Sequence, residues 1–95
     1  MADTVTEAMA EIRRIAREEL EFEGGVEPSH DLLRDLHLDS LGLTVLAVGL
    51  ENRFRVLLSE EDAQGVRTVE DLARLVAARV AAMEQKSTPE AGAHP

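Results

Sequence analysis

The chain of 95 residues contains no cysteine, no tryptophan and no tyrosine, and its only aromatic residues are Phe22 and Phe54. Without cysteine it can form neither disulfides nor thiolate metal sites. With so few aromatic rings, leucine, valine and alanine must supply most of the core, which suits helices joined by loops. The length fits one domain, because domains typically have 50 to 250 residues. These absences therefore indicate one small, mainly helical domain.

The sequence also lacks a long hydrophobic run and a basic segment followed by an apolar one at its start. A membrane span needs about 20 consecutive apolar residues, and a secretory signal needs the basic and apolar regions in that order. We therefore predict no membrane span and no signal peptide, and we expect a cytoplasmic protein.

Basic residues are few, since 10 Lys and Arg stand against 19 Asp and Glu, which gives a net charge of −9. Such a chain repels phosphate backbones, so we expect no nucleic-acid partner. Acidic surfaces attract basic patches on partner proteins and speed the encounter with them. The charge also keeps a small domain soluble. Composition alone leaves both roles open.

Three segments carry a helix start signal, in which a Ser or Thr is followed three residues later by an acid; they begin at Thr4, Ser59 and Thr68. The first signal predicts a helix of about 17 residues, because apolar residues recur after it at helical spacing. We expect Gly24 and Gly25 to end this helix, since glycine readily takes the left-handed conformations of a helix end.

The other two start signals predict the second half of the chain. The signal at Ser59 predicts a very short helix that ends near Gly65, and the signal at Thr68 predicts a longer last helix. The apolar face of that helix consists of Val69, Leu72, Val76, Val80 and Met83. From Glu84 the composition becomes polar and small. Such a segment cannot bury enough surface to offset its ordering entropy, so we expect residues 84–95 to be a disordered tail.

A long loop, residues 24–39, leads into an apolar helix over residues 41–54. Asp39 is placed to cap this helix with its side chain. Ser40 then falls at the first turn, where unpaired backbone N–H groups and the positive end of the helix dipole favour an anion. Its hydroxyl is well sited to carry a phosphodiester. The alternative is that Asp39 and Ser40 are only helix start signals.

The segment Asp35-Leu36-His37-Leu38-Asp39-Ser40-Leu41 resembles the attachment site of acyl carrier proteins. The resemblance extends over about residues 4–83, because chain length, acidity and the order of the helices also agree. It implies an all-α four-helix bundle of the acyl-carrier type. Three longer helices and one short helix are expected, with a long loop between the first two. We therefore expect a carrier domain over residues 1–83, followed by the tail.

In the family, the serine of this motif is esterified to 4′-phosphopantetheine, which derives from coenzyme A. The resemblance implies that Ser40 holds this group, that Asp39 helps to define the target of a phosphopantetheinyl transferase, and that Leu41 completes the motif. The protein would be a carrier and not an enzyme. It would be a monomer without a metal site that presents acyl thioesters to loading, condensing or acyl-transfer enzymes. Fatty acid, polyketide and specialised lipid pathways all remain open.

Three other interpretations of Ser40 were weighed. Peptidyl carriers usually have Gly-Gly ahead of the residue before the serine, and Leu38-Asp39 departs from that pattern, so acyl cargo is favoured over aminoacyl cargo. An unmodified helical interaction module is a further alternative. A catalytic serine would need an oriented base and an oxyanion site. No G-x-S-x-G elbow is present, and we regard His30 and His37 as ordinary polar loop residues.

Helical spacing gives the central helix two apolar faces. One face is expected to meet the last helix in the core, where related carriers admit an acyl chain; a closed core is the alternative. The predicted acyl-chain contacts are Leu46, Leu50 and Phe54 of this helix and Val69, Leu72 and Val76 of the last helix. The second apolar face consists of Leu41, Val45 and Val48. Either the loop and the short helix cover it, or it binds partners together with Glu51 and Asn52. We favour partner binding, because Leu41 directly follows Ser40.

Overall fold

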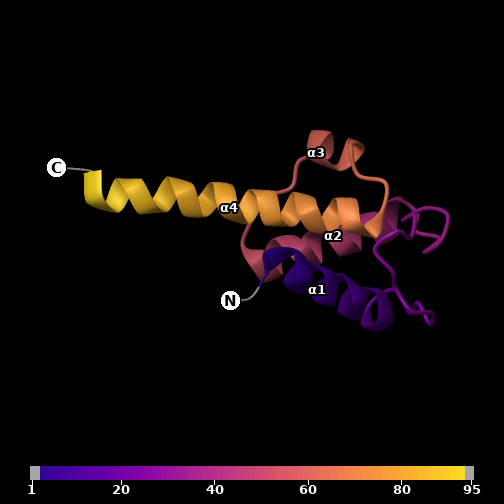
Figure 1. The fold of residues 1–95 in the computed structure, drawn as a ribbon. Coiled ribbons are helices and arrows are strands. Elements are labelled where there is room, and N and C mark those ends of the chain that lie inside the picture. The colour runs from indigo at the N-terminus through magenta and orange to yellow at the C-terminus, as the bar shows by residue number, and fades with distance from the viewer. Residues whose placement is uncertain (1–2, 94–95) are drawn as a thin grey trace.

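The computed structural model describes residues 3–93, and within this range it contains four helices and no strand (Figure 1). The helices are α1 (Thr4–Glu18), α2 (Ser40–Phe54), α3 (Glu60–Gln64) and α4 (Val69–Ala93). One isolated antiparallel bridge joins Asp31 in the loop between α1 and α2 to Thr68 just before α4. The prediction of an all-α chain with three longer helices and one short helix is thereby confirmed.

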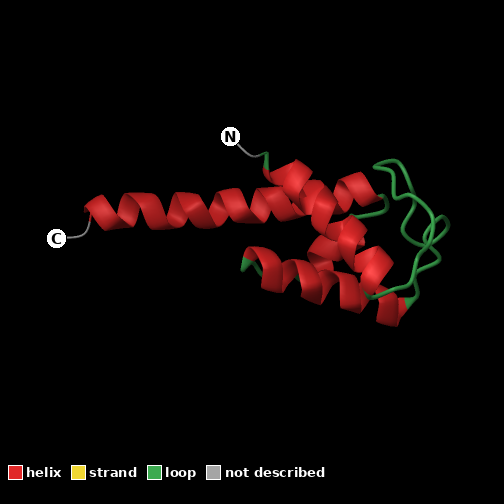
Figure 2. Ribbon diagram, turned by 90° about the horizontal axis from the view of Figure 1, so that it is seen from below, coloured by secondary structure: helices red, strands yellow, loops and turns green. Residues whose placement is uncertain are grey.

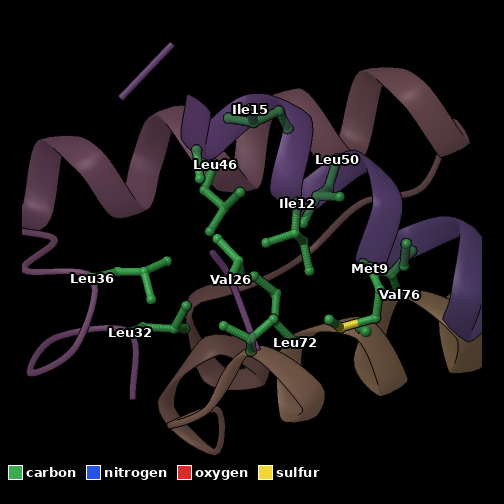
Figure 3. Close-up of a cluster of buried hydrophobic side chains, with 14 residues drawn as sticks. Met9, Ile12, Ile15, Val26, Leu32, Leu36, Leu46, Leu50, Leu72 and Val76 are labelled. Carbon is green, nitrogen blue, oxygen red and sulfur yellow. The ribbon is translucent and has the colours of Figure 1, made fainter. Parts of the chain in front are cut away.

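The core lies between α1, α2 and α4, and α1 packs against both of the other long helices. The side chains that point into this space are drawn in Figure 3, and the largest fully buried ones are Ile12, Ile15, Leu46, Leu50, Val69 and Val76. They recur at helical spacing along their helices, so each long helix buries one apolar side. Val26, Leu32 and Leu36 of the long loop close one end of the core.

Helix α1 approaches α2 closely at Gly49. A Cβ atom placed on Gly49 would lie 2.6 Å from Cδ1 of Ile15, which is fully buried. Real Cβ atoms do not come this close to a neighbour, so Gly49 provides the room that Ile15 occupies. The conformational cost of glycine inside a helix is about 1 kcal/mol. At Gly49 the close contact between α1 and α2 offsets this cost.

Side-chain caps begin each helix of the bundle. Asp39 caps α2 as predicted, because its Oδ1 accepts the N–H of Gly42 at 2.8 Å. The helix start signals at Ser59 and Thr68 are also confirmed, and each forms a capping box. The hydroxyl accepts the backbone N–H of the acid three residues later, and that acid's carboxylate accepts the backbone N–H of the Ser or Thr. The prediction that Thr4 caps the first helix is wrong. The cap is Asp3, whose Oδ1 accepts a backbone N–H at 3.3 Å, so Thr4 already lies inside the helix.

The first helix also ends earlier than its sequence pattern predicted. It stops at Glu18, and the left-handed residue that follows is Glu21, with φ 57°, while no described glycine has a positive φ. The N–H of Phe22 donates to the carbonyl of Ala16 at 2.8 Å. Leu20 and Phe22 then pack, partly buried, against the core. The chain therefore turns where its next apolar side chains can return to the core, before it reaches the glycine pair.

The last helix continues well beyond the bundle, as Figures 1 and 2 show. We expected disorder from residue 84 onwards, but residues 84–93 continue α4 in the structure, and residues 94–95 lie outside the described range. Adding a residue to an existing helix fixes only one more residue per hydrogen bond, so a helix that is already packed can continue past its last core contact. The division into a domain over residues 1–83 and a tail stays a prediction.

Within the part of the chain that the structure describes, no helix combines the length and the apolar character that a membrane span requires.

Candidate attachment site

The segment before Ser40 is an ordered loop that is fastened to the core. Leu32 and Leu36 are buried, and the N–H of Leu32 donates to the carbonyl of Arg67 at 3.0 Å. The Asp31 carboxylate accepts the N–H groups of Leu33 and Arg34 at 2.9 and 3.0 Å. The bond from the Arg34 N–H is the main reason why the pKa of Asp31 is lowered. The loop therefore brings the chain to Ser40 along a fixed path.

Ser40 is exposed and is the first residue of α2. Asp39 before it is also exposed and holds the first turn through the N–H of Gly42. The first turn carries no acidic side chain, so its N–H groups and the helix dipole offer a favourable place for a phosphate. The local arrangement is the one that the sequence predicted: an accessible hydroxyl at a capped helix N-terminus.

The two loop histidines differ in their contacts. His30 has a structural role, because its Nδ1 accepts the backbone N–H of Glu27 at 3.1 Å. His37 is exposed and has a left-handed backbone, with φ 58°. The backbone N–H of Leu38, the next residue, donates to the carbonyl of Leu32 at 3.1 Å. Neither of these hydrogen bonds joins a histidine to Ser40.

A cavity of about 850 Å³ lies between α2, α3, the start of α4 and the loop before Ser40. Of the six predicted acyl-chain contacts, Leu46 and Leu72 line this cavity. The other four do not line it: Leu50, Val69 and Val76 are fully buried in the core and Phe54 is partly buried. The remaining apolar lining comes from Leu32, Leu33, Leu43, Ala47, Ala63 and Val66, and charged residues at positions 31, 34, 35 and 67 also line the cavity.

Sequence reasoning missed most of this lining. Leu32 and Leu33 belong to the loop, and Ala63 and Val66 belong to α3 and the turn after it, where no long periodic pattern exists. Only the docking of these segments against α2 brings them together. The boxes at Ser59 and Thr68 located the segments but gave no signal of a shared cavity.

Helix α3 is joined to α4 by a polar contact. Arg79 of α4 donates a hydrogen bond to the carboxylate of Asp62, which also accepts the N–H of Ser59 at 3.1 Å. The hydrogen bond from Arg79 is the largest cause of a lowered pKa of Asp62, and the two bonds to Ser59 add to it. Asp62 therefore caps α3 and ties it to α4, beside Ala63 in the cavity wall.

The second apolar face is largely uncovered. The side chain of Leu41 is 71% exposed and that of Val48 is 45% exposed, while Val45 between them packs, partly buried, against the core. Asn52 is exposed. Glu51 also holds the turn after α2, because its Oε2 accepts the backbone N–H of Leu58 at 2.8 Å, and its role in partner binding stays a prediction.

One exposed apolar residue close to this face was missed in the sequence. Leu57, in the turn between α2 and α3, is 83% exposed. It borders a shallow hollow together with Glu51, Asn52, Arg55 and Val56. Because it lies outside any helix, periodicity gives no signal for it. In the same described range, no group of three or more His, Asp or Glu side chains is arranged to hold a metal ion.

Comparison with known proteins adds independent findings. Residues 10–76 match the family model described as a phosphopantetheine attachment site. The chain is 36% identical over 77 residues to an acyl carrier protein of Rhodococcus erythropolis, covering 76% of this chain and 80% of that protein. It is 35% identical over 94 residues to a meromycolate extension acyl carrier protein of Mycolicibacterium smegmatis, covering 98% of this chain and 90% of that protein.

A solved structure shows the same fold. It is an acyl carrier protein from Thermotoga maritima, which superimposes with a TM-score of 0.74 over 84% of this chain and 94% of that one. Its sequence identity is 21%, so this likeness concerns the fold.

Proposed function

This chain belongs to the acyl carrier protein family, and from that premise we propose that Ser40 is the residue that bears its 4′-phosphopantetheine. The protein is an acyl carrier and not an enzyme, and 4′-phosphopantetheine is its expected prosthetic group. The observation that carries the proposal is the position of Ser40, exposed at the first residue of α2 and inside the matched residues 10–76.

The residues at this place fit such a group. Ser40 offers an exposed hydroxyl for the phosphodiester, and it stands at the N-terminal end of α2, where the helix dipole favours an anion. Asp39 fixes that turn, and Leu41 leaves open space beside it. When bound, the group supplies a terminal thiol that holds an acyl chain as a thioester, while the protein supplies recognition and shelter.

Intact mass after reaction with coenzyme A and a phosphopantetheinyl transferase tests the assignment. We expect the wild type to gain one phosphopantetheine and Ser40→Ala to gain none while keeping the wild-type circular dichroism spectrum. Ser40→Thr should fold equally well but load poorly, because its extra methyl group crowds the attacking oxygen. If Ser40→Ala still gains the mass, another residue is the attachment site. If the wild type gains none, carriage on this arm is ruled out.

The cavity supports a proposal about shelter. Its apolar lining adjoins Leu46 and Leu72, and it lies beside the loop that leads to Ser40, so we propose that it receives the acyl chain. A chain that enters it should raise the thermal midpoint, because a ligand stabilises the fold that binds it. Equal thermal midpoints of the holo form and of a long-chain acyl form would show that the core stays closed.

The cargo is proposed to belong to a lipid chain-extension pathway. Support comes from the relative that is named for meromycolate extension and aligns over 98% of this chain. Intact mass of the carrier purified from its own host should then show long aliphatic acyl groups. Polyketide intermediates or aminoacyl groups in that spectrum would assign it to another pathway.

As a family member the protein interacts with a phosphopantetheinyl transferase and with acyl-handling enzymes. We propose that these partners bind the second apolar face, with Leu41 and Val48 as exposed contacts and Asn52 beside them. Val45→Glu should weaken the use of the carrier by its own enzymes. The notion of a monomer in the cytoplasm stays part of this proposal, supported by a net charge of −9 that makes copies repel one another.

A further inference from the structure

The turn between α2 and α3 displays one apolar side chain on a rigid support. Val56 is buried and Leu58 is partly buried, whereas Leu57 between them points away and is 83% exposed. Both neighbours are held by Glu51. Its carbonyl accepts the N–H of Val56 at 3.2 Å, and its Oε2 accepts the N–H of Leu58 at 2.8 Å. Leu57 is therefore presented in a fixed position.

A single exposed leucine is ordinary on a protein surface, so its surroundings decide its meaning. Leu57 shares the hollow of the turn with Asn52. Asn52 is four residues after Val48, and Val48 is seven residues after Leu41, so these residues follow one side of α2. The second apolar face therefore continues past the end of the helix to Leu57. From Ser40 to Phe54 the helix is about 22 Å long at 1.5 Å per residue.

The charge along this surface differs from that of the whole chain. Ser40–Phe54 contains one acid, Glu51, and its carboxylate is engaged by the N–H of Leu58. At the far end, Arg53 lies over the ring of Phe54 and 4.0 Å from the carboxylate of Glu11, while Arg55 is exposed beside the hollow, which Glu51 also borders. The surface is thus mainly apolar, and its end presents the exposed cation Arg55 on a chain with a net charge of −9. A carboxylate on a partner would be attracted to Arg55 there.

We propose that Leu57 and Arg55 form a second anchoring point for the acyl-handling enzymes that this carrier serves, at the end of α2 opposite Ser40. The partner enzyme has an apolar pocket for Leu57 and a carboxylate that faces Arg55. The inference rests on the proposed carrier function and extends its docking surface along the whole of α2. It concerns a partner enzyme and not a second copy. Two copies, each with a net charge of −9, repel one another.

The test uses the loaded carrier and its own condensing enzyme. The apo protein is loaded at Ser40 with an electrophilic pantetheine analogue that reacts with an active-site cysteine, and the condensing enzyme that it traps in its host is purified. Elongation kinetics of that enzyme are then measured with the wild-type acyl carrier, Leu57→Asn, Arg55→Ala and the control Met83→Gln. Met83 is another exposed apolar residue, but it lies on α4.

We expect Leu57→Asn to raise KM about fivefold and Arg55→Ala about twofold, with kcat unchanged in both, because anchors act on binding. Met83→Gln should match the wild type. Between about 50 and 300 mM NaCl, KM should change less than twofold, because apolar contacts are not screened. A KM of Leu57→Asn equal to that of Met83→Gln, or a steep rise of KM with salt, would overturn the proposal.

Loading separates this inference from the proposed function. All three variants should gain one phosphopantetheine at the wild-type rate and keep the wild-type thermal midpoint, since the residues are exposed. If they load normally and KM does not respond, the anchoring point is wrong while the carrier function stands. If neither the variants nor the wild type load, the carrier function itself is wrong, and the anchoring point falls with it.

Discussion

Helix α2 packs against α1 in a very different way from its packing toward α3 and the loop before Ser40. On the α1 side, Gly49 admits Ile15 with no room for even a methyl group, and Leu50 is fully buried. On the α3 side, Leu43 and Ala47 border a cavity of about 850 Å³. One helix therefore has a filled side, which gives the fold its stability, and a side with space, which gives the proposed acyl chain a place.

Shortening a side chain on the filled side should have the largest effect. Leu50→Ala removes a fully buried side chain where neighbours cannot collapse into the space, so we expect a loss of about 2–5 kcal/mol in the free energy of unfolding. Urea denaturation measures it. The matched change Leu43→Ala, on the cavity side, should cost less, because Leu43 is only partly buried. Equal losses would mean that the two sides are packed alike.

Larger side chains on the two sides of α2 should give the second largest difference in stability. Gly49→Val forces new methyl groups against Ile15 and should cost about 1–3 kcal/mol by overpacking. Ala63→Leu places its new atoms in the cavity, and we expect a change within about 0.5 kcal/mol. The same leucine should reduce the rise in thermal midpoint that a long acyl chain gives. An unchanged rise in Ala63→Leu would place the acyl chain elsewhere.

Loss of the contact between Asp62 and Arg79, on the cavity side, should lower stability less and in a way that depends on pH. Asp62→Asn weakens the contact with Arg79 and should lower the thermal midpoint at pH 7. The pKa of Asp62 is lowered in the folded protein, so its contribution is present above the ordinary pKa and is lost as pH falls through the folded value. The difference between variant and wild type should therefore shrink below about pH 4. A difference that is constant down to pH 2 would contradict this role.

Removal of residues 84–95 should have the smallest effect, because the last buried core residue in the described range is Val76. The truncated chain should load phosphopantetheine at the wild-type rate and unfold within about 2 °C of the wild type, a shift that corresponds to well under 1 kcal/mol. Differential scanning calorimetry and intact mass check both statements. A large fall in the midpoint would place the domain boundary after residue 83.

The parts of the structure that were predictable from sequence are those that local chemistry determines. Asp39 and the boxes at Ser59 and Thr68 contain donor and acceptor within four residues of each other, so the pattern alone located three helix starts. The core sides of α2 and α4 follow from helical spacing, and Leu46 and Val76 are buried as expected. Ser40 was located by its motif together with this helix start.

What could not be predicted depends on contacts between distant segments or on competition between neighbours. Asp3 and Thr4 are both good caps, and the carboxylate one residue earlier takes the role. Glu21 turns left-handed because Leu20 and Phe22 return to the core, although Gly24 and Gly25 would take that conformation more cheaply. The dual use of Glu51 and the exposure of Leu57 arise only when the turn after α2 is formed.

The projection of α4 has a practical consequence for any experiment that needs a handle on this carrier. The bridge between Asp31 and Thr68 places the first turn of α4 beside the loop that leads to Ser40. From there the helix runs 25 residues, or about 37 Å, away from that end (Figure 1). A fluorophore, affinity tag or fused domain is thus better attached at the C-terminal end of α4 than near the loop that leads to Ser40, because it then starts far from the proposed attachment site.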